Sequence, residues 1–167
     1  MEYRVLIKKM DITFYKKFKR LWKHYLIQIP IATLSIFIAT LFINIQNTVM
    51  IASIGATTFI IFILPTSYTA NRRNVIGGHL IGIGVGMLFT LIPASSSIIL
   101  LLIFSLTVGT AMLFMAIFDM EHPPACGTAL GVVSFGYTFP SLFAFITGII
   151  VLSLLHHFFK SKLKDLI

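Results

Sequence analysis

The chain has 167 residues, of which 57% are hydrophobic and 11% are charged, and its mean hydropathy is +0.98. Soluble domains contain about 25% charged residues, so this composition excludes an ordinary soluble protein and predicts an integral membrane protein. The net charge of +8 does not indicate a nucleic-acid partner, because ten of the thirteen cations cluster at residues 8–23 and 160–164. Basic clusters beside apolar segments are typical of the cytoplasmic ends of membrane spans.

Residues 12–25, ITFYKKFKRLWKHY, combine apolar and basic positions at helical spacing. Phe18, Leu21 and Tyr25 recur at intervals of three or four, with basic residues between them, which predicts an amphipathic helix on the cytoplasmic leaflet. We therefore expect three parts in the chain. They are a basic cytoplasmic or interfacial segment at 1–25, a transmembrane helical domain at 26–160 and a basic tail at 161–167.

Six apolar runs follow, at residues 26–45, 49–64, 75–92, 98–118, 123–138 and 140–159. They predict an all-α membrane protein with about six hydrophobic helical segments. The loops after the second and fourth runs hold all the charges between residues 23 and 160, namely Arg72, Arg73, Asp119 and Glu121. Six crossings place these loops and both termini in the cytoplasm, as the positive-inside tendency favours, and we expect the protein in the inner membrane of the cell.

The runs at 49–64 and 123–138 are short, since an untilted helix needs about 20 residues to cover the hydrocarbon. Both contain small or helix-breaking residues, in ASIGATT and HPPACGTALG, so each run either crosses in a broken form or re-enters on the same side. Interrupted segments at corresponding positions of two halves are a sequence pointer to a transport site. This pattern suggests a 3+3 inverted repeat as a hypothesis.

Gly78, Gly82 and Gly86 recur every four residues in GGHLIGIGVG and therefore share one face of the third helix. Small residues at this spacing allow another helix to approach closely. We expect this face to serve helix packing.

Two helix starts bring polar residues next to the apolar runs. His122 precedes two prolines and the fifth helix, whose first-turn N–H donors and partial positive charge suit an anion. Arg73, Asn74 and His79 stand at the start of the third helix, on the same side of the membrane in the six-span arrangement. An ionisable group inside an apolar run, such as His79, normally faces protein or water. These residues predict a donor-rich cytoplasmic mouth; the plainer interpretation is that the arginines mark topology and His122 caps its helix.

Other chemistry stays open at this point. His122 and Cys126 are four residues apart, and Glu121 and His79 could join them as zinc or copper ligands in a membrane metal-binding protein or enzyme. A scaffold without transport, assembled through the glycine face, is a further alternative. The chain has no dense ligand spacing and a single cysteine, so we expect no bound metal or cofactor and no enzymatic activity.

The sequence resembles the HPP family of integral membrane proteins, named for its His-Pro-Pro motif. Two blocks carry the resemblance, GATTFIIFILPTSYTANRRNVIGGH at 55–79 and HPPACGTAL at 122–130, and their order and separation also agree. The family typically has Gln-Pro-Arg where this chain has Asn-Arg-Arg at 71–73, and Ala-Gly-Ala where it has Ala-Cys-Gly at 125–127. Members are usually described with four spans, and some plant and cyanobacterial members are linked to nitrite transport.

The resemblance and the residues together predict a transporter or channel for a small inorganic anion, with nitrite as the first candidate. The expected substrate-binding residues are donors or small residues: Arg73, Asn74, His79, His122, Gly55, Thr57 and Thr58. Glu121 is expected to gate the path or to share a proton with His122. Because six short spans enclose little volume, we expect a homo-oligomer in the lipid bilayer.

Overall fold

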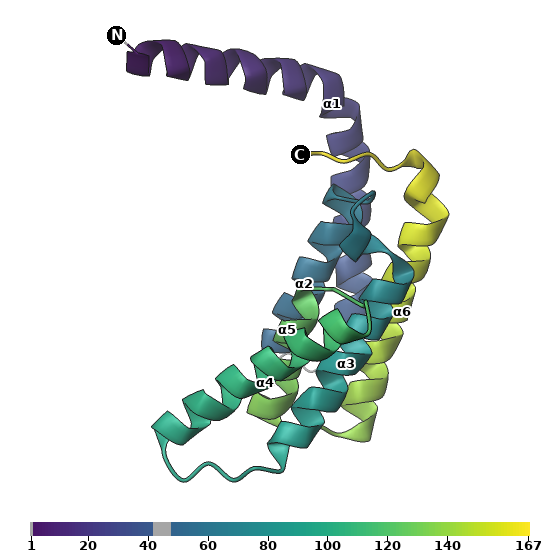
Figure 1. Ribbon diagram of the computed structural model, residues 1–167. Coiled ribbons are helices and arrows are strands. Elements are labelled where there is room, and N and C mark those ends of the chain that lie inside the picture. Colours follow the sequence, from purple (N-terminus) through teal and green to yellow (C-terminus); the bar gives the residue numbers. More distant parts are fainter. Residues whose placement is uncertain (1, 42–47) are drawn as a thin grey trace.

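The computed structural model describes residues 2–41 and 48–167, with side chains from residue 15 onward. These parts form six α-helices and two 3₁₀ turns (Figure 1). In chain order they are α1 (Glu2–Thr40), α2 (Thr48–Ile63), η1 (Tyr68–Ala70), α3 (Arg72–Thr90), α4 (Ser97–Ile117), α5 (Pro124–Phe135), α6 (Phe139–Phe159) and η2 (Lys160–Lys162). The predicted all-α class with six helical segments is confirmed.

Within the described ranges, three helical stretches are long and apolar enough to cross a membrane: Tyr15–Thr40, Ser97–Ile117 and Phe139–Lys162. The helices α2 and α5 are shorter apolar helices. α5 has 12 residues, or about 18 Å of helix, against about 30 Å of hydrocarbon. It ends before the predicted run does, because Gly136 has a φ of 69° and Thr138 already caps α6.

The helix α1 joins the predicted amphipathic segment and the first apolar run without a break. The last part of the predicted run 26–45 lies outside the described residues. Figure 1 shows the N-terminal part of α1 extending from one end of the bundle at a steep angle to the part that packs against α2 and α6. Pro30 lies inside α1, where its missing N–H weakens the helical hydrogen bonding. Tyr15 and Trp22 are exposed among the basic residues, as in an interfacial helix.

The helix α3 packs against α4, α5 and α6, while α2 contacts α1 and α5 (Figure 1). Glycines of α3 face the backbone of α5 at close range. A Cβ placed on Gly82 would stand 2.5 Å from Ala125 O, and one placed on Gly86 would stand 2.7 Å from Ala129 O. No side chain fits at either position, so α5 lies against the glycine face of α3 within one subunit.

The C-terminal tail packs across one end of the bundle. The buried Gln28 side chain donates to Phe62 O at 2.7 Å and to Lys164 O at 2.9 Å, and it accepts from Lys164 N at 3.0 Å. Leu166 N donates to Ile63 O at 2.9 Å. These bonds join the tail to α1 and to the end of α2, beside the loop that leads into α3.

The two charged loops meet each other. Arg73 Nη2 donates to Phe118 O at 3.0 Å, and the Arg73 guanidinium pairs with the Asp119 carboxylate at 3.5 Å. The Tyr68 hydroxyl donates to Asp119 Oδ1 at 2.6 Å, and this bond raises the pKa of Tyr68. The loops that precede α3 and α5 therefore lie on the same side of the bundle, as six crossings require.

Candidate functional site

Five hydrophilic side chains meet in the interior of the bundle. The helix α2 provides Ser53 and Thr57, α3 provides His79, the loop before α5 provides His122, and α5 provides Thr128. Each of these residues is at most 4% exposed. Buried polar groups cost free energy unless they are hydrogen-bonded, so such a cluster needs internal partners. These five side chains form what we name the histidine–hydroxyl network.

The Thr57 hydroxyl lies between the two imidazole rings. Its Oγ1 is 2.9 Å from His79 Nε2 and 3.0 Å from His122 Nε2. The two ring centroids are 4.9 Å apart, and the rings meet edge to face. One threonine of α2 therefore connects the histidine of α3 with the histidine of the His-Pro-Pro sequence.

The network continues from His79 into α5. His79 Nδ1 lies 2.8 Å from Thr128 Oγ1, which lies 2.8 Å from Ser53 Oγ. Ser53 Oγ donates to Pro124 O at 2.6 Å, because a carbonyl oxygen can only accept. Both ring nitrogens of His79 thus have a hydroxyl partner, and the row ends on a backbone carbonyl.

On the other side, the ring of His122 is turned into the bundle. Its Nδ1 donates to Thr69 O at 2.9 Å, and the residue is 0% exposed. Burial lowers the pKa of His122 to about 4, against a smaller opposite effect of the Thr69 carbonyl. The ring is therefore neutral at pH 7, with its proton on Nδ1 and a lone pair on Nε2 that faces Thr57.

Small residues make room for this arrangement. A Cβ on Gly78 would stand 2.7 Å from His122 Cβ, and a Cβ on Gly127 would stand 3.3 Å from Ser53 Cβ. Ser53 and Thr57 are four residues apart, so they share one face of α2. The glycines let α2, α3 and the loop before α5 converge on the point where the polar atoms bond.

A cleft of about 330 Å³ reaches His122 from the side of α4. Its lining comes from η1, α4, α5 and the loop before α5: Thr69, Met112, Met115, Ala116, Glu121, His122, Pro123 and Cys126. Mostly apolar walls with a few polar groups are typical of small-molecule sites. Since one water occupies about 30 Å³ in the liquid, the cleft has room for a small ion with some of its water.

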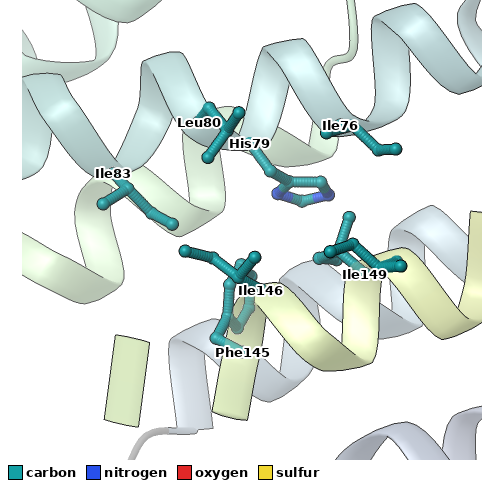
Figure 2. A pocket seen from close by; sticks show the side chains of 8 residues that line it. Ile76, His79, Leu80, Ile83, Phe145, Ile146 and Ile149 are labelled. Carbon is teal, nitrogen blue, oxygen red and sulfur yellow. The ribbon is translucent and has the colours of Figure 1, made fainter. Parts of the chain in front are cut away.

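On the α6 side, His79 meets apolar side chains. Figure 2 shows its ring facing the gap between α3 and α6, near Ile76, Phe145 and Ile149. The His79 and Phe145 ring centroids are 5.5 Å apart. The space left there is about 10 Å³, the lower limit for one water molecule. An anion therefore does not fit on this side of His79 in the present conformation.

The structure brings together three of the predicted substrate-binding residues, Thr57, His79 and His122. It places Gly55 and Thr58 elsewhere, along an apolar cleft between α1 and α2. The reason is helical geometry: consecutive residues point about 100° apart, so Thr57 and Thr58 cannot face the same neighbour.

Asn74 and Arg73 border the network without joining it. Asn74 is buried and donates to Glu121 O at 3.2 Å, so it holds the loop that carries His122. The Arg73 side chain is 60% exposed and pairs with Asp119 at the surface. Glu121 itself is exposed and lines the cleft beside His122.

The expectation of free N–H donors at the start of α5 is wrong. Ala125 N donates to His122 O at 2.9 Å, and Cys126 N donates to Pro123 O at 3.1 Å. Pro123 already has helical angles, with φ at −51° and ψ at −38°, so the prolines form a turn that uses these donors internally. His122 does not cap α5 either, because Pro123 is the N-cap residue and the ring of His122 bonds to Thr69 O and to Thr57 Oγ1.

Across the described part of the chain, no three His, Cys, Asp or Glu side chains come together as they do around a metal ion. His122 and Cys126 both line the cleft, but His79 lies behind Thr57 with hydroxyl partners on both ring nitrogens. The alternative of a metal site built on these residues and Glu121 gains no support from this geometry.

Sequence reasoning missed Ser53, Thr128 and the Thr69 carbonyl. Ser53 carried a usable signal, because it lies one helical turn before Thr57 in an otherwise apolar run. Thr128 lies in the block that follows His-Pro-Pro, where the small residues predict only an interrupted helix. No sequence pattern marks a single backbone carbonyl such as that of Thr69.

A family model for the transmembrane region of HPP proteins matches residues 17–164. The chain belongs to the HPP family. Comparison with curated proteins gives no match, and comparison with solved structures gives none. In this HPP protein, the blocks at residues 55–79 and 122–130 contain four of the five network residues. The two blocks, far apart in the sequence, therefore meet in the histidine–hydroxyl network.

Proposed function

We propose that this HPP protein moves a small inorganic anion across the membrane as a transporter or channel, with nitrite as the first candidate. The observation that carries the proposal is the histidine–hydroxyl network, buried between apolar helices and reached by a cleft of about 330 Å³. Ionisable groups inside a membrane protein are costly and typically mark substrate or ion pathways. The link of some family members to nitrite transport supplies the first candidate.

The charge at this end of the bundle supports an anion as the substrate. Arg72 and Arg73 are the first residues of α3, and a basic cluster follows α6 at residues 160–164. A surface of one sign attracts ions of the opposite sign and raises their local concentration. Asp119 offsets Arg73, and Glu121 and Asp165 are the other acidic residues at this end, so Arg72 and the three lysines leave an excess of positive charge.

The network can compensate the charge of an anion that has lost its water. A bare anion cannot enter a low-dielectric interior unless fixed donors replace its hydration. The O–H and N–H groups of the neutral network already bond to one another and to carbonyls, so the group that would compensate an anion is an imidazolium at His122, in the wall of the cleft. The Glu121 carboxylate repels an anion when it is charged, so we propose that it gates the cleft or exchanges a proton with His122.

Uptake into proteoliposomes tests this function, with nitrite, nitrate, formate and chloride as probes and an inert cation as a control. We expect nitrite uptake by the wild type and an initial rate at least about tenfold lower in His122→Ala, which corresponds to a loss of about 1.4 kcal/mol in the transition state. Arg73→Ala should lower the rate less, because its charge is already paired with Asp119. Thr107→Val is the matched control, since this buried α4 hydroxyl bonds to Ile103 O of its own helix.

Two results would contradict the proposal. One is a folded wild type that moves none of the four anions. The other is an unchanged rate in both His122→Ala and Arg73→Ala. Metal retained through purification would favour the metal-binding alternative, and assembly without flux would favour the scaffold.

We also propose that the protein assembles as a homo-oligomer in the inner membrane, with both termini in the cytoplasm. The helix α4 supports the assembly, because its leucines are 50–64% exposed in one subunit: Leu101, Leu102, Leu106 and Leu113. Lipid or a second subunit covers such a face. The mass of the complex released from detergent distinguishes the two, and a single-chain mass contradicts the oligomer.

A further inference from the structure

We infer that the histidine–hydroxyl network takes up one proton together with the anion and passes it between His122 and His79 through the Thr57 hydroxyl. The inference rests on the proposed anion transport and deepens it, because it names the ion that accompanies the substrate. It makes the protein a proton-coupled symporter.

The first step is a count of protons. Six hydrogen-bonding contacts of 2.6–3.0 Å run in a row between two backbone carbonyls. The groups in the row are, in order, Pro124 O, Ser53, Thr128, His79, Thr57, His122 and Thr69 O. Three hydroxyls and two neutral imidazoles supply five protons. Six contacts need six, so the neutral network is one proton short.

The shortage falls on Thr57. Ser53 donates to a carbonyl, so it accepts from Thr128, which in turn accepts from His79 Nδ1. His122 Nδ1 also donates to a carbonyl. Both Nε2 atoms then present lone pairs to one hydroxyl with a single proton, for which the Ser53 carbonyl at 3.0 Å also competes. At least one imidazole nitrogen is left without a donor.

A sixth proton completes the row in either of two ways. When it is on His79, Nε2–H donates to Thr57 Oγ1 and the Thr57 hydroxyl donates to His122 Nε2. When it is on His122, both bonds run in the opposite direction. In the exchange, the Thr57 O–H bond breaks as its proton forms an N–H bond with the neutral ring. The N–H bond of the imidazolium breaks at the same time, and its proton re-forms the Thr57 O–H bond. The charge moves from ring to ring while every heavy atom keeps its place.

The anion supplies the opposite charge that the proton needs. A lone imidazolium in an apolar interior is costly, and burial keeps the pKa of His122 at about 4. An anion in the cleft next to His122 stabilises the imidazolium, because an opposite charge within a few ångströms favours the charged form. Anion and proton then enter as a neutral pair, which is cheaper to bury than either ion.

The elements around the network offer no charged group in contact with the Thr57 hydroxyl among the described residues. The helix α6 contributes Phe145, α4 contributes methionines to the cleft, and η1 contributes a carbonyl. The nearby titratable groups lie at the cleft or the surface: Glu121, Cys126, Tyr68, Arg73 and Asp119. The proton that completes the row is therefore held by a histidine.

Nitrite accumulation in proteoliposomes tests the coupling. The nitrite concentration starts equal inside and outside, the outside is made one pH unit more acid, and the membrane potential is held at zero. One proton per anion predicts about tenfold accumulation of nitrite inside, because one pH unit is a tenfold ratio of protons. Uncoupled transport predicts a ratio of about 1. Vesicles without protein measure the leak of nitrous acid through the lipid.

Variants at Thr57 test the relay. Thr57→Val keeps the shape but removes the hydroxyl, so nitrite accumulation should fall to the level of protein-free vesicles. Thr57→Ser restores a hydroxyl and should restore accumulation, which separates loss of the relay from loss of folding. Thr107→Val removes a buried hydroxyl outside the network and should accumulate nitrite as the wild type does.

The outcomes separate the two claims. Downhill nitrite flux with a ratio of about 1 overturns the coupling and leaves the anion transport standing. Tenfold accumulation that persists in Thr57→Val overturns the relay. If neither the wild type nor any variant moves nitrite, a second measurement decides. A pH-sensitive dye in weak buffer detects proton uptake by the purified protein when nitrite is added. Uptake that Thr57→Val abolishes supports the network as a proton acceptor, and no uptake by the wild type overturns it.

Discussion

Gly82→Ala is predicted to destabilise the protein, while Gly84→Ala is not. Both glycines lie in α3, but Gly82 faces the backbone of α5 and Gly84 has nothing within 4 Å of an added Cβ. The pair therefore compares one methyl group at a helix contact with the same methyl group on an open face. Any general effect of alanine on the helix is shared by the two variants.

The size of the effect follows from the distance. A Cβ at Gly82 would stand 2.5 Å from Ala125 O, about 0.9 Å inside the 3.4 Å at which ordinary contact begins. The obstacle is helix backbone, which cannot turn aside as a side chain does, so α3 and α5 must move apart. Overpacking of this kind costs about 1–3 kcal/mol. The separation also pulls His79 away from Thr128, so we expect slower transport as well.

Thermal unfolding of the three proteins in one detergent measures the effect. For a chain of this size, 1 kcal/mol lowers the midpoint by about 2–4 °C. Gly82→Ala should unfold several degrees below the wild type, and Gly84→Ala should unfold at or above it. Equal midpoints for Gly82→Ala and the wild type would show that α3 and α5 are not in backbone contact.

Three further predictions concern topology, pH and the tail. In a Cys126→Ser background, cysteines at positions 72 and 165 should react from the same side of the membrane, and opposite sides would contradict the contact between tail and loop. Because the pKa of His122 is lowered to about 4, the unfolded chain takes up its proton first as the pH falls. In anion-free buffer, stability should therefore drop by about 3 kcal/mol between pH 6.5 and pH 4, and a His122→Gln variant that drops equally would refute the assignment. Gln28→Leu removes three hydrogen bonds to Phe62 and Lys164, so the rate of amide hydrogen exchange at residues 163–167 should increase. An unchanged rate would mean that these bonds do not hold the tail.

Much of the helical layout could be predicted from the sequence because charge and hydropathy act locally. The apolar runs at 49–64 and 98–118 match α2 and α4 to within one residue at each end. The glycines of α3 could be singled out because their spacing of four defines one face of a helix. His79 and His122 stood out because ionisable groups beside apolar runs are costly.

The network as a whole could not be predicted, because it depends on which helix faces meet. Thr57 and Thr58 look alike in the sequence, and only the packing of α2 shows that Thr57 faces the histidines while Thr58 faces α1. Ser53 and Thr128 are ordinary small residues until α2 and α5 lie side by side. The N–H groups of α5 failed as predicted donors because the turn at Pro123 uses them itself.

The position of bound nitrite relative to His122 tests the central claim most directly. Solid-state NMR on protein with ¹³C-labelled histidine can detect ¹⁵N-nitrite through the dipolar coupling between the two nuclei. We predict a coupling in the wild type and in Thr107→Val that disappears in His122→Gln, because the proposed anion site is the cleft that His122 lines. Bound nitrite with no histidine coupling, or with a coupling that His122→Gln leaves unchanged, would place the anion elsewhere and contradict the account.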